Sequence, residues 1–286
     1  MDRTALETLY RERGLARIWD ILSPHAKNAI RIAPRPADEA SLPLGGSKIG
    51  GCPDLPPDVE WFTYGGRPMS FLAQINLREV HPYDSEGRLP ATGILYFFYD
   101  SEQEVWGFDP SDADGSRVYF HDGDPAQLRR RPLPESLCHD EDGAPLIAPC
   151  ALSLSAECTL PSLWSSLAGD IDYSEEEFEA YFALMEELGE EQFKLLGHSD
   201  NVQGGMELEC ELVTNGISCG TPEAYNHPRF HELEPNAGRW HLLFQMDSSD
   251  TVGTMWGDMG RIYYWIREEH LQARRFGESW AILQCY

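Results

Sequence analysis

The sequence has little positive charge. Its 286 residues include 22 lysines and arginines against 48 aspartates and glutamates, so the formal net charge is −26. A surface this negative repels the phosphates of nucleic acids and the anionic headgroups of membranes. The composition therefore excludes binding to nucleic acid through a general basic surface, and it excludes a polybasic membrane anchor.

Long apolar runs and closely spaced cysteines are also missing. No apolar run approaches the roughly 20 residues of a membrane-spanning helix. Residues 1–7 are charged and mixed, without the apolar stretch that a secretory signal needs. The seven cysteines are scattered and none forms a Cys-x-x-Cys pair. We therefore expect reduced thiols and a cytoplasmic location.

The motifs that hold metals or cofactors are incomplete. Residues 112–115 and 140–143 have the spacing of acidic calcium loops, but the ligand positions before and after them hold unsuitable residues. The nine histidines are scattered and form no short-spaced set with cysteine, as zinc would require. Residues 46–51 lead to Pro53 rather than to the helix that a phosphate loop requires. We expect no metal and no cofactor.

A catalytic site is not evident from the sequence. A thiol nucleophile would need Cys52 or Cys210 to meet His198 or His241 in the fold. No Gly-x-Ser-x-Gly motif is present, and the acidic residues are too numerous to single out a catalytic pair.

The residues that are present predict a single compact domain over residues 1–286. Apolar residues make up 42% of the chain and aromatic residues 11%, which is enough for a large core. Residues 1–32 predict helices, and the Pro- and Gly-rich residues 33–57 predict an ordered loop. Residues 94–99 read as a strand buried on both faces. Ser174 and Glu177 form the capping box of a helix that runs to residue 191, and residues 206–213 predict a short helix.

Two pairs of segments resemble each other within the chain. Residues 71–76 match 242–247, and residues 93–98 match 260–265, in the same order and at similar spacing. This similarity predicts an internal duplication. The first pseudo-repeat spans residues 40–168, a connecting segment with an acidic helix spans 169–196, and the second pseudo-repeat spans 197–286. The expected fold class is α+β, with a mainly antiparallel sheet built from two strand-rich halves and peripheral helices.

Matching polar positions in the paired strands suggest a binding site. Strict alternation places Leu72, Gln74 and Asn76 on one face and leaves an apolar face of Phe71, Ala73 and Ile75 for the core. If the halves pack about a two-fold axis, the polar faces meet across a cleft. The candidate cleft residues are Trp61, Gln74, Asn76, Gln245, Asp247, Trp256 and Asp258. The alternative is that the glutamines only satisfy backbone groups of the Pro- and Gly-rich loops.

Several blocks of sequence resemble the YwqG-like family of unknown function. They are residues 48–53, 71–76, 93–98, 208–212 and 255–260, and the similarity extends from about residue 49 to the C-terminus. The resemblance implies a compact α+β bacterial protein of the cytosol without an established activity. Some members of the family accompany secreted-toxin systems, which implies an immunity role. The family supplies no catalytic residues to carry over.

These observations predict a non-enzymatic binding protein. The first hypothesis is an immunity-like protein that neutralises a basic protein partner, because opposite charge steers association. The alternatives are a protein that binds a small polar ligand in the cleft between the halves, and an enzyme that uses the same cleft. The acidic face of helix 174–191 is interpreted as a solvated surface, with a docking site as the alternative.

Overall fold

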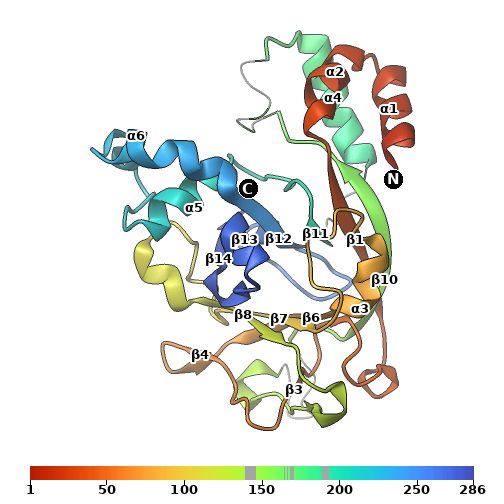
Figure 1. Cartoon of the computed structure of the whole chain (residues 1–286), viewed down its shortest axis with the longest axis vertical. Coiled ribbons are helices and arrows are strands. Elements are labelled where there is room, and N and C mark those ends of the chain that lie inside the picture. The colour runs from red at the N-terminus through yellow and green to blue at the C-terminus, as the bar shows by residue number, and fades with distance from the viewer. Residues whose placement is uncertain (139–145, 164, 166, 168–170, 189–192) are drawn as a thin grey trace.

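The computed structural model describes residues 1–138, 146–163, 165, 167, 171–188 and 193–286, and its main feature is a ten-stranded sheet (Figure 1). The strands follow the order β14-β13-β12-β11-β1-β10-β2-β6-β7-β8, and all neighbouring strands are antiparallel. They span β1 (Lys27–Pro36), β2 (Lys48–Ile49), β6 (Ser70–Asn76), β7 (Ile94–Tyr99), β8 (Ser116–His121), β10 (Cys150–Thr159), β11 (Phe193–Leu196), β12 (Trp240–Asp247), β13 (Arg261–Arg267) and β14 (Trp280–Gln284). Two small sheets join β3 (Asp54–Leu55) to β9 (Arg129–Arg130) and β4 (Thr63–Tyr64) to β5 (Arg67–Pro68). The predicted α+β class with a mainly antiparallel sheet is confirmed.

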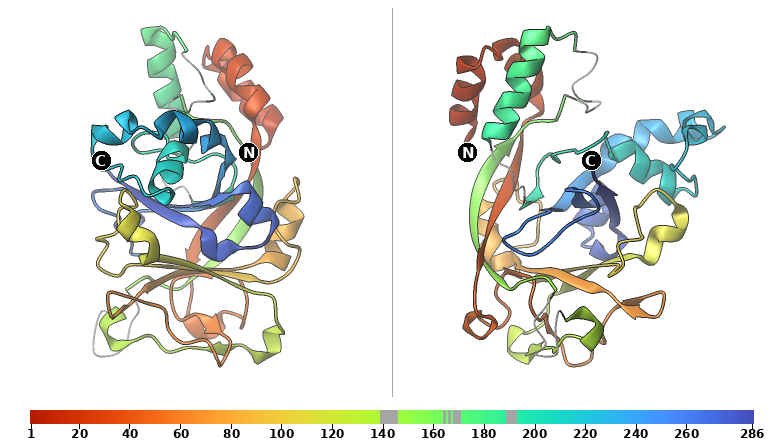
Figure 2. Two further views of the ribbon diagram at one scale, coloured as in Figure 1. Left: turned by 60° about the vertical axis from the view of Figure 1, so that its left-hand side comes forward. Right: turned by 180° about the vertical axis from the view of Figure 1, so that it is seen from behind.

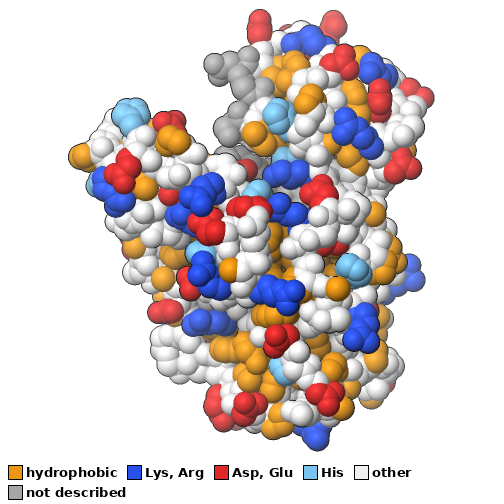
Figure 3. Space-filling view, in the orientation of Figure 1, with side chains coloured by type: hydrophobic (Ala, Val, Ile, Leu, Met, Phe, Trp, Pro, Cys, Tyr) orange, Lys and Arg blue, Asp and Glu red, His pale blue; other side chains and the backbone are white. Residues whose placement is uncertain are grey.

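The helices lie around the sheet rather than within it. They are α1 (Arg3–Glu12), α2 (Ala16–Leu22), α3 (Leu77–Val80), α4 (Glu175–Glu187), α5 (Glu207–Thr214), α6 (Phe230–Leu233) and α7 (Glu268–Gln272). Helices α1, α2 and α4 form a separate layer at one end of the long β1–β10 ribbon, and α5 and α6 project from the opposite side of the sheet (Figures 1 and 2). The space-filling view shows a hollow between these two projections (Figure 3). No described helix is both long and apolar enough to cross a bilayer.

Strand β1 corrects the prediction of helices over residues 1–32. Helices α1 and α2 form as expected, but the chain becomes extended at Lys27. Residues 29–32 pair with β11 on one side and β10 on the other, whereas residues 33–36 pair only with β10. Beyond Ile32, the side of β1 that faces β11 has no neighbouring strand. Pro34 and Pro36, which lack a backbone N–H, can therefore lie at the end of the strand without a loss of hydrogen bonds on that side.

Helix α4 begins as the sequence predicts. The Ser174 side chain accepts a hydrogen bond from the Glu177 backbone, and the Glu177 carboxylate accepts one from the Ser174 backbone. Tyr181 and Leu184 are buried against α1 and α2. The predicted helix end at residue 191 lies outside the described residues. At the end of the predicted connecting segment 169–196, residues 193–196 form strand β11.

The two halves of the sheet fold onto each other around a shared aromatic core. The ring of Phe97 in β7 lies 4.4 Å from that of Phe244 in β12 and 5.2 Å from that of Tyr264 in β13, measured between centroids. Every residue of β7 is buried, as predicted for this strand.

A β-bulge in each half changes the predicted strand faces. Pairing shifts between Phe71 and Ala73 in β6 and between Leu242 and Phe244 in β12. Leu72 and Leu243 therefore lie in the shared core beside Ala73 and Phe244, whereas Phe71 and Leu242 pack on the outer faces. The placement of Leu72 with Gln74, predicted from strict alternation, is wrong because the extra residue of a bulge interrupts alternation.

The shared core predicts that both halves unfold together. Phe97→Ala removes a large side chain that contacts both halves, so we expect a loss of about 3–5 kcal/mol in the free energy of unfolding. Urea denaturation followed by tryptophan fluorescence and by circular dichroism should give coincident transitions. Two separate transitions, only one of them moved by the substitution, would contradict a shared core.

Candidate functional site

Each half of the sheet contains a buried lysine that faces an aspartate six residues later. The Lys48 side chain is 1% exposed, and its Nζ lies 2.7 Å from Glu39 Oε1 and 3.9 Å from Asp54 Oδ2. The Lys194 side chain is 2% exposed, and its Nζ lies 2.5 Å from Asp200 Oδ2. A glycine with positive φ, Gly51 or Gly197, stands midway between lysine and aspartate. The spacing Lys-x-x-Gly-x-x-Asp therefore occurs once in each half.

The candidate glutamines hold these aspartates in place. Gln74 Oε1 accepts a hydrogen bond from the Asp54 backbone at 2.8 Å, and Gln74 Nε2 donates one to Asp54 Oδ2 at 2.9 Å. Gln245 makes the same two bonds to Asp200, each at 2.9 Å. Gln74 pairs in register with Lys48, and Gln245 pairs with Lys194.

In each half, a tyrosine on the strand next to the glutamine also contacts the aspartate. Tyr96 is the register partner of Gln74, and Tyr263 is that of Gln245. The Tyr96 hydroxyl donates to the Asp54 carbonyl, and the Tyr263 hydroxyl donates to the Asp200 carbonyl at 2.7 Å. Matched contacts of this kind are expected of a duplicated unit, and the duplication itself stays a prediction.

The glutamines do not meet across a shared cleft. Ala73 and Ile75 on either side of Gln74 belong to the central core, and so do the residues that flank Gln245. Because side chains alternate along a strand, both glutamines point out of that core, each toward its own loop. Both are fully buried. Their role is to hold the Lys-x-x-Gly-x-x-Asp loops, which is the structural alternative considered for them.

Asn76 and Asp247 also contact their own halves. The Asn76 side chain accepts a hydrogen bond from the Arg78 backbone at the start of α3 and donates one to the Gly45 carbonyl. Asp247 is buried, and its carboxylate lies 2.9 Å from Arg261 Nε.

The remaining three candidate residues occupy different environments. Trp61 is half-buried, and its indole donates to the Met69 carbonyl. Trp256 is buried against Tyr99, with ring centroids 5.8 Å apart. Asp258 is exposed. Of the seven candidate residues, only Asp258 lies fully on the surface.

Asp258 belongs to an exposed surface where segments of both halves meet. We call this surface the junction surface; it comprises Glu102, Gln103, Glu104, Trp106, Asp258, Met259 and Tyr286. The Gly257 backbone donates to Gln103 Oε1 at 3.3 Å. The Leu283 backbone donates to the Trp106 carbonyl, and the Tyr286 backbone donates to the Asp258 carbonyl. These bonds place residues 102–106 beside residues 257–259 and the C-terminal strand.

The junction surface combines exposed apolar side chains with carboxylates. Trp106 is 36% exposed, Met259 is 57% exposed and Tyr286 is 79% exposed. The side chains of Glu102 and Glu104 are 56% and 75% exposed, and Arg67 lies 3.9 Å and 3.8 Å from their carboxylates.

Two residues of this surface have an unusual backbone conformation. Gln103 has φ of 55° and Met259 has φ of 51°. Only two other described residues besides glycine, Leu196 and Arg274, have positive φ. Such conformations cost free energy in residues other than glycine. The sequence showed no pattern that distinguishes the exposed Met259 from the buried Trp256.

The cysteines are poorly suited to nucleophilic catalysis. Burial is the main cause that raises the pKa of Cys52, and it raises the pKa of Cys210 well above the usual range. A nucleophilic thiol needs the opposite shift. His198 bonds the His25 carbonyl at 2.7 Å and His241 bonds Glu268 at 2.7 Å, so both histidine rings have other partners.

The described residues contain no group of three or more histidine, cysteine or acidic side chains that could hold a metal ion. The calcium-like residues 140–143 lie outside the described part of the chain.

Residues 47–285 match a family described as "Domain of unknown function (DUF1963)". This match covers most of the chain, so the protein belongs to that family. No curated protein matches the chain.

The glutamine contacts predict a loss of stability on substitution. Gln74→Ala and Gln245→Ala leave the backbone N–H of buried Asp54 and of half-buried Asp200, respectively, without its acceptor. Each should lower the free energy of unfolding by about 1–3 kcal/mol, and Gln74→Ala should have the larger effect. Urea denaturation measures the change. Gln127→Ala, in an exposed turn, is the control and should change little. Unchanged stability in both buried variants would contradict the structural role.

The lysine–aspartate pairs predict acid sensitivity. Burial opposes ionisation of Asp200, but Lys194 and Arg261 overcome it and lower the pKa of its carboxyl group. An aspartate with a lowered folded pKa stabilises the protein above the unfolded pKa of about 3.9, and this stabilisation is lost as the pH falls through the folded pKa.

Asp200→Asn should therefore lower the free energy of unfolding near neutral pH. It should also make the decrease of this free energy at acidic pH less steep. Urea denaturation at a series of pH values tests this expectation. Asp250→Asn, at an exposed position, is the control. An acid dependence as steep in Asp200→Asn as in the unmodified protein would contradict the expected role of Asp200.

Proposed function

We propose that the protein is a non-enzymatic binding protein that holds a basic protein partner at the junction surface. The observation that carries the proposal is the exposure of Trp106, Met259 and Tyr286 among carboxylates. Tryptophan and tyrosine are enriched among the residues that contribute most to protein–protein binding, and methionine adapts its shape to a partner. Acidic side chains around them favour a partner with lysine or arginine beside an apolar residue.

The net charge of −26 supports the same partner chemistry. A negative protein attracts a basic one over a distance and accelerates association, and added salt weakens this effect. Neutralisation of such a partner in the cytoplasm is the immunity-like role implied by the resemblance to YwqG-like proteins. The two strained residues, Gln103 and Met259, support a preformed surface, which lowers the entropy lost on binding.

Affinity capture from the native host tests this proposal. The unmodified protein should retain a basic protein at low salt and release much of it at high salt. Trp106→Ala and Met259→Ala should each reduce the captured amount at least tenfold, as expected for residues that contribute about 1.4 kcal/mol or more to binding.

Tyr225→Ala is the matched control, because Tyr225 is 45% exposed and lies in the turn that precedes α6, outside the junction surface. Its capture should equal that of the unmodified protein. Thermal denaturation establishes that each variant is folded. Capture of no basic protein, or equal capture by the control and junction variants, would overturn the proposal.

A further inference from the structure

The β4–β5 hairpin places one basic side chain against the acidic edge of the junction surface. Gly65 and Gly66, both with positive φ, form the turn of this hairpin, which projects from the sheet (Figure 1). The next residue is Arg67. Its Nη2 lies 3.4 Å from Asp100 Oδ1 and 3.8 Å from Glu104 Oε2, and its Nε lies 3.9 Å from Glu102 Oε1. One guanidinium therefore stands among three carboxylates, two of which belong to the junction surface.

Arg67 is held loosely in this position. Its hydrogen bond to Asp100 is 3.4 Å long, compared with about 3 Å for a typical N–H···O bond. Its buried Nε has no hydrogen-bond partner within the described part of the chain. By contrast, Arg88 lies 2.5 Å from Glu268. Long contacts made by a half-exposed side chain contribute little free energy, so Arg67 can be displaced at low cost.

The acidic turn beside Arg67 is held more firmly. The Asp100 side chain is 1% exposed, and its carboxylate accepts hydrogen bonds from the backbones of Glu102 and Glu104 at 3.4 Å and 2.9 Å. Gln103 between them accepts the bond from Gly257 in the other half. Glu102 and Glu104 thus extend into solvent from an anchored turn, where a basic group of another molecule can reach them without rearranging the backbone.

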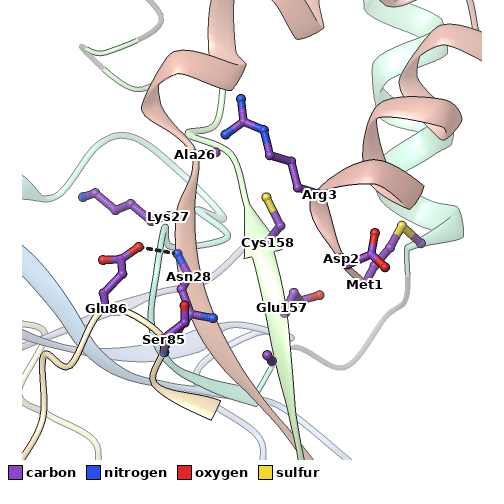
Figure 4. A pocket seen from close by; sticks show the side chains of 11 residues that line it. Met1, Asp2, Arg3, Ala26, Lys27, Asn28, Ser85, Glu86, Glu157 and Cys158 are labelled. Atoms are coloured by element: carbon purple, nitrogen blue, oxygen red, sulfur yellow. Dashed lines mark hydrogen bonds between the residues drawn. The ribbon is translucent and has the colours of Figure 1, made fainter. Parts of the chain in front are cut away.

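This excess of charge of one sign is absent from the groove beside the β1–β10 ribbon. The groove has a volume of about 310 Å³, and its charged lining residues are Asp2, Arg3, Lys27, Glu86 and Glu157 (Figure 4). Lys27 and Glu86 stand on one side of the ribbon and Arg3 on the other. Both signs are present and do not converge, so the groove favours no ligand of one charge. At the junction surface, three carboxylates against one guanidinium leave two formal negative charges uncompensated.

We propose that Arg67 is an intramolecular competitor of the basic partner: it occupies the acidic edge of the junction surface and gives way to an arginine or lysine of that partner. The competition rests on the proposed function, since both concern the same surface. An arginine that approaches Glu102 and Glu104 from solvent can form the short charge-assisted hydrogen bonds that Arg67 does not form. Because Arg67 weakens the binding of every basic segment, it favours a partner that also places an apolar side chain on Trp106.

Titration of a fluorescently labelled peptide of alternating arginine and leucine, followed by anisotropy in about 0.1 M salt, tests the competition. Arg67→Gln removes the competing cation and should bind the peptide about threefold more tightly than the unmodified protein, the effect expected of a half-exposed ion pair. Arg67→Lys keeps the cation, so its affinity should lie closer to that of the unmodified protein than to that of Arg67→Gln.

Arg229→Gln is the matched control. The Arg229 side chain is 44% exposed, lies 3.4 Å from Glu232 and stands at the start of α6, outside the junction surface. Its substitution changes the net charge equally and also frees a carboxylate. The affinity should stay within about 1.5-fold of the unmodified protein, since salt screens charges that are not adjacent to the bound peptide.

Thermal denaturation establishes that each variant is folded. No gain of affinity in Arg67→Gln, or an equal gain in Arg229→Gln, would overturn the competition. Trp106→Ala in the same titration separates this result from the proposed function. Weaker binding by Trp106→Ala without a gain in Arg67→Gln would overturn the role of Arg67 and leave the junction surface as the binding site.

Discussion

The burial of one lysine in each half of the sheet constrains much of the surrounding structure. Removing an ammonium group from water costs several kcal/mol unless an acid and further hydrogen-bond partners accompany it. Glu39 and Asp54 provide the acids for Lys48, and Asp200 provides the acid for Lys194. A glycine-containing loop brings each aspartate back beside its lysine. A glutamine and a tyrosine from the next two strands then hold the aspartate. One buried charge thus specifies side chains on three adjacent strands.

The sequence predicted elements whose signal is local. The capping box of α4 and the apolar run of β7 are examples, because neither depends on distant residues. Ala26, Ala29 and Ile30 fit helical spacing, but strand β1 forms because residues 29–32 pair with a strand on both sides. Strand β2 has two residues and strand β11 has four, so both are too short to produce a periodic pattern in the sequence.

The candidate site was predictable only in part. The sequence identified Gln74 and Gln245 as matching positions, and they do occupy matching register positions. Alternation also places Gln74 on the face opposite Ala73 and Ile75, which do belong to the shared core. It could not show that each glutamine points toward its own loop, because that depends on how the two halves pack. The Lys-x-x-Gly-x-x-Asp spacing occurs in both halves of the sequence, but the distance from this motif to its glutamine differs between them. In the second half, α5 and α6 separate this motif from its glutamine strand, so the two copies do not align at one constant offset.

The position of β1 links the N-terminal segment to the family fold. Strand β1 lies between β11 and β10, so it joins the two half-sheets, yet it precedes the residues that match the family. The same strand carries Lys27 and forms one side of the β1–β10 ribbon that supports the helical layer. The N-terminal segment is therefore part of the hydrogen-bonded sheet that the two halves share, and without β1 the edges of β10 and β11 would be left without their shared neighbour.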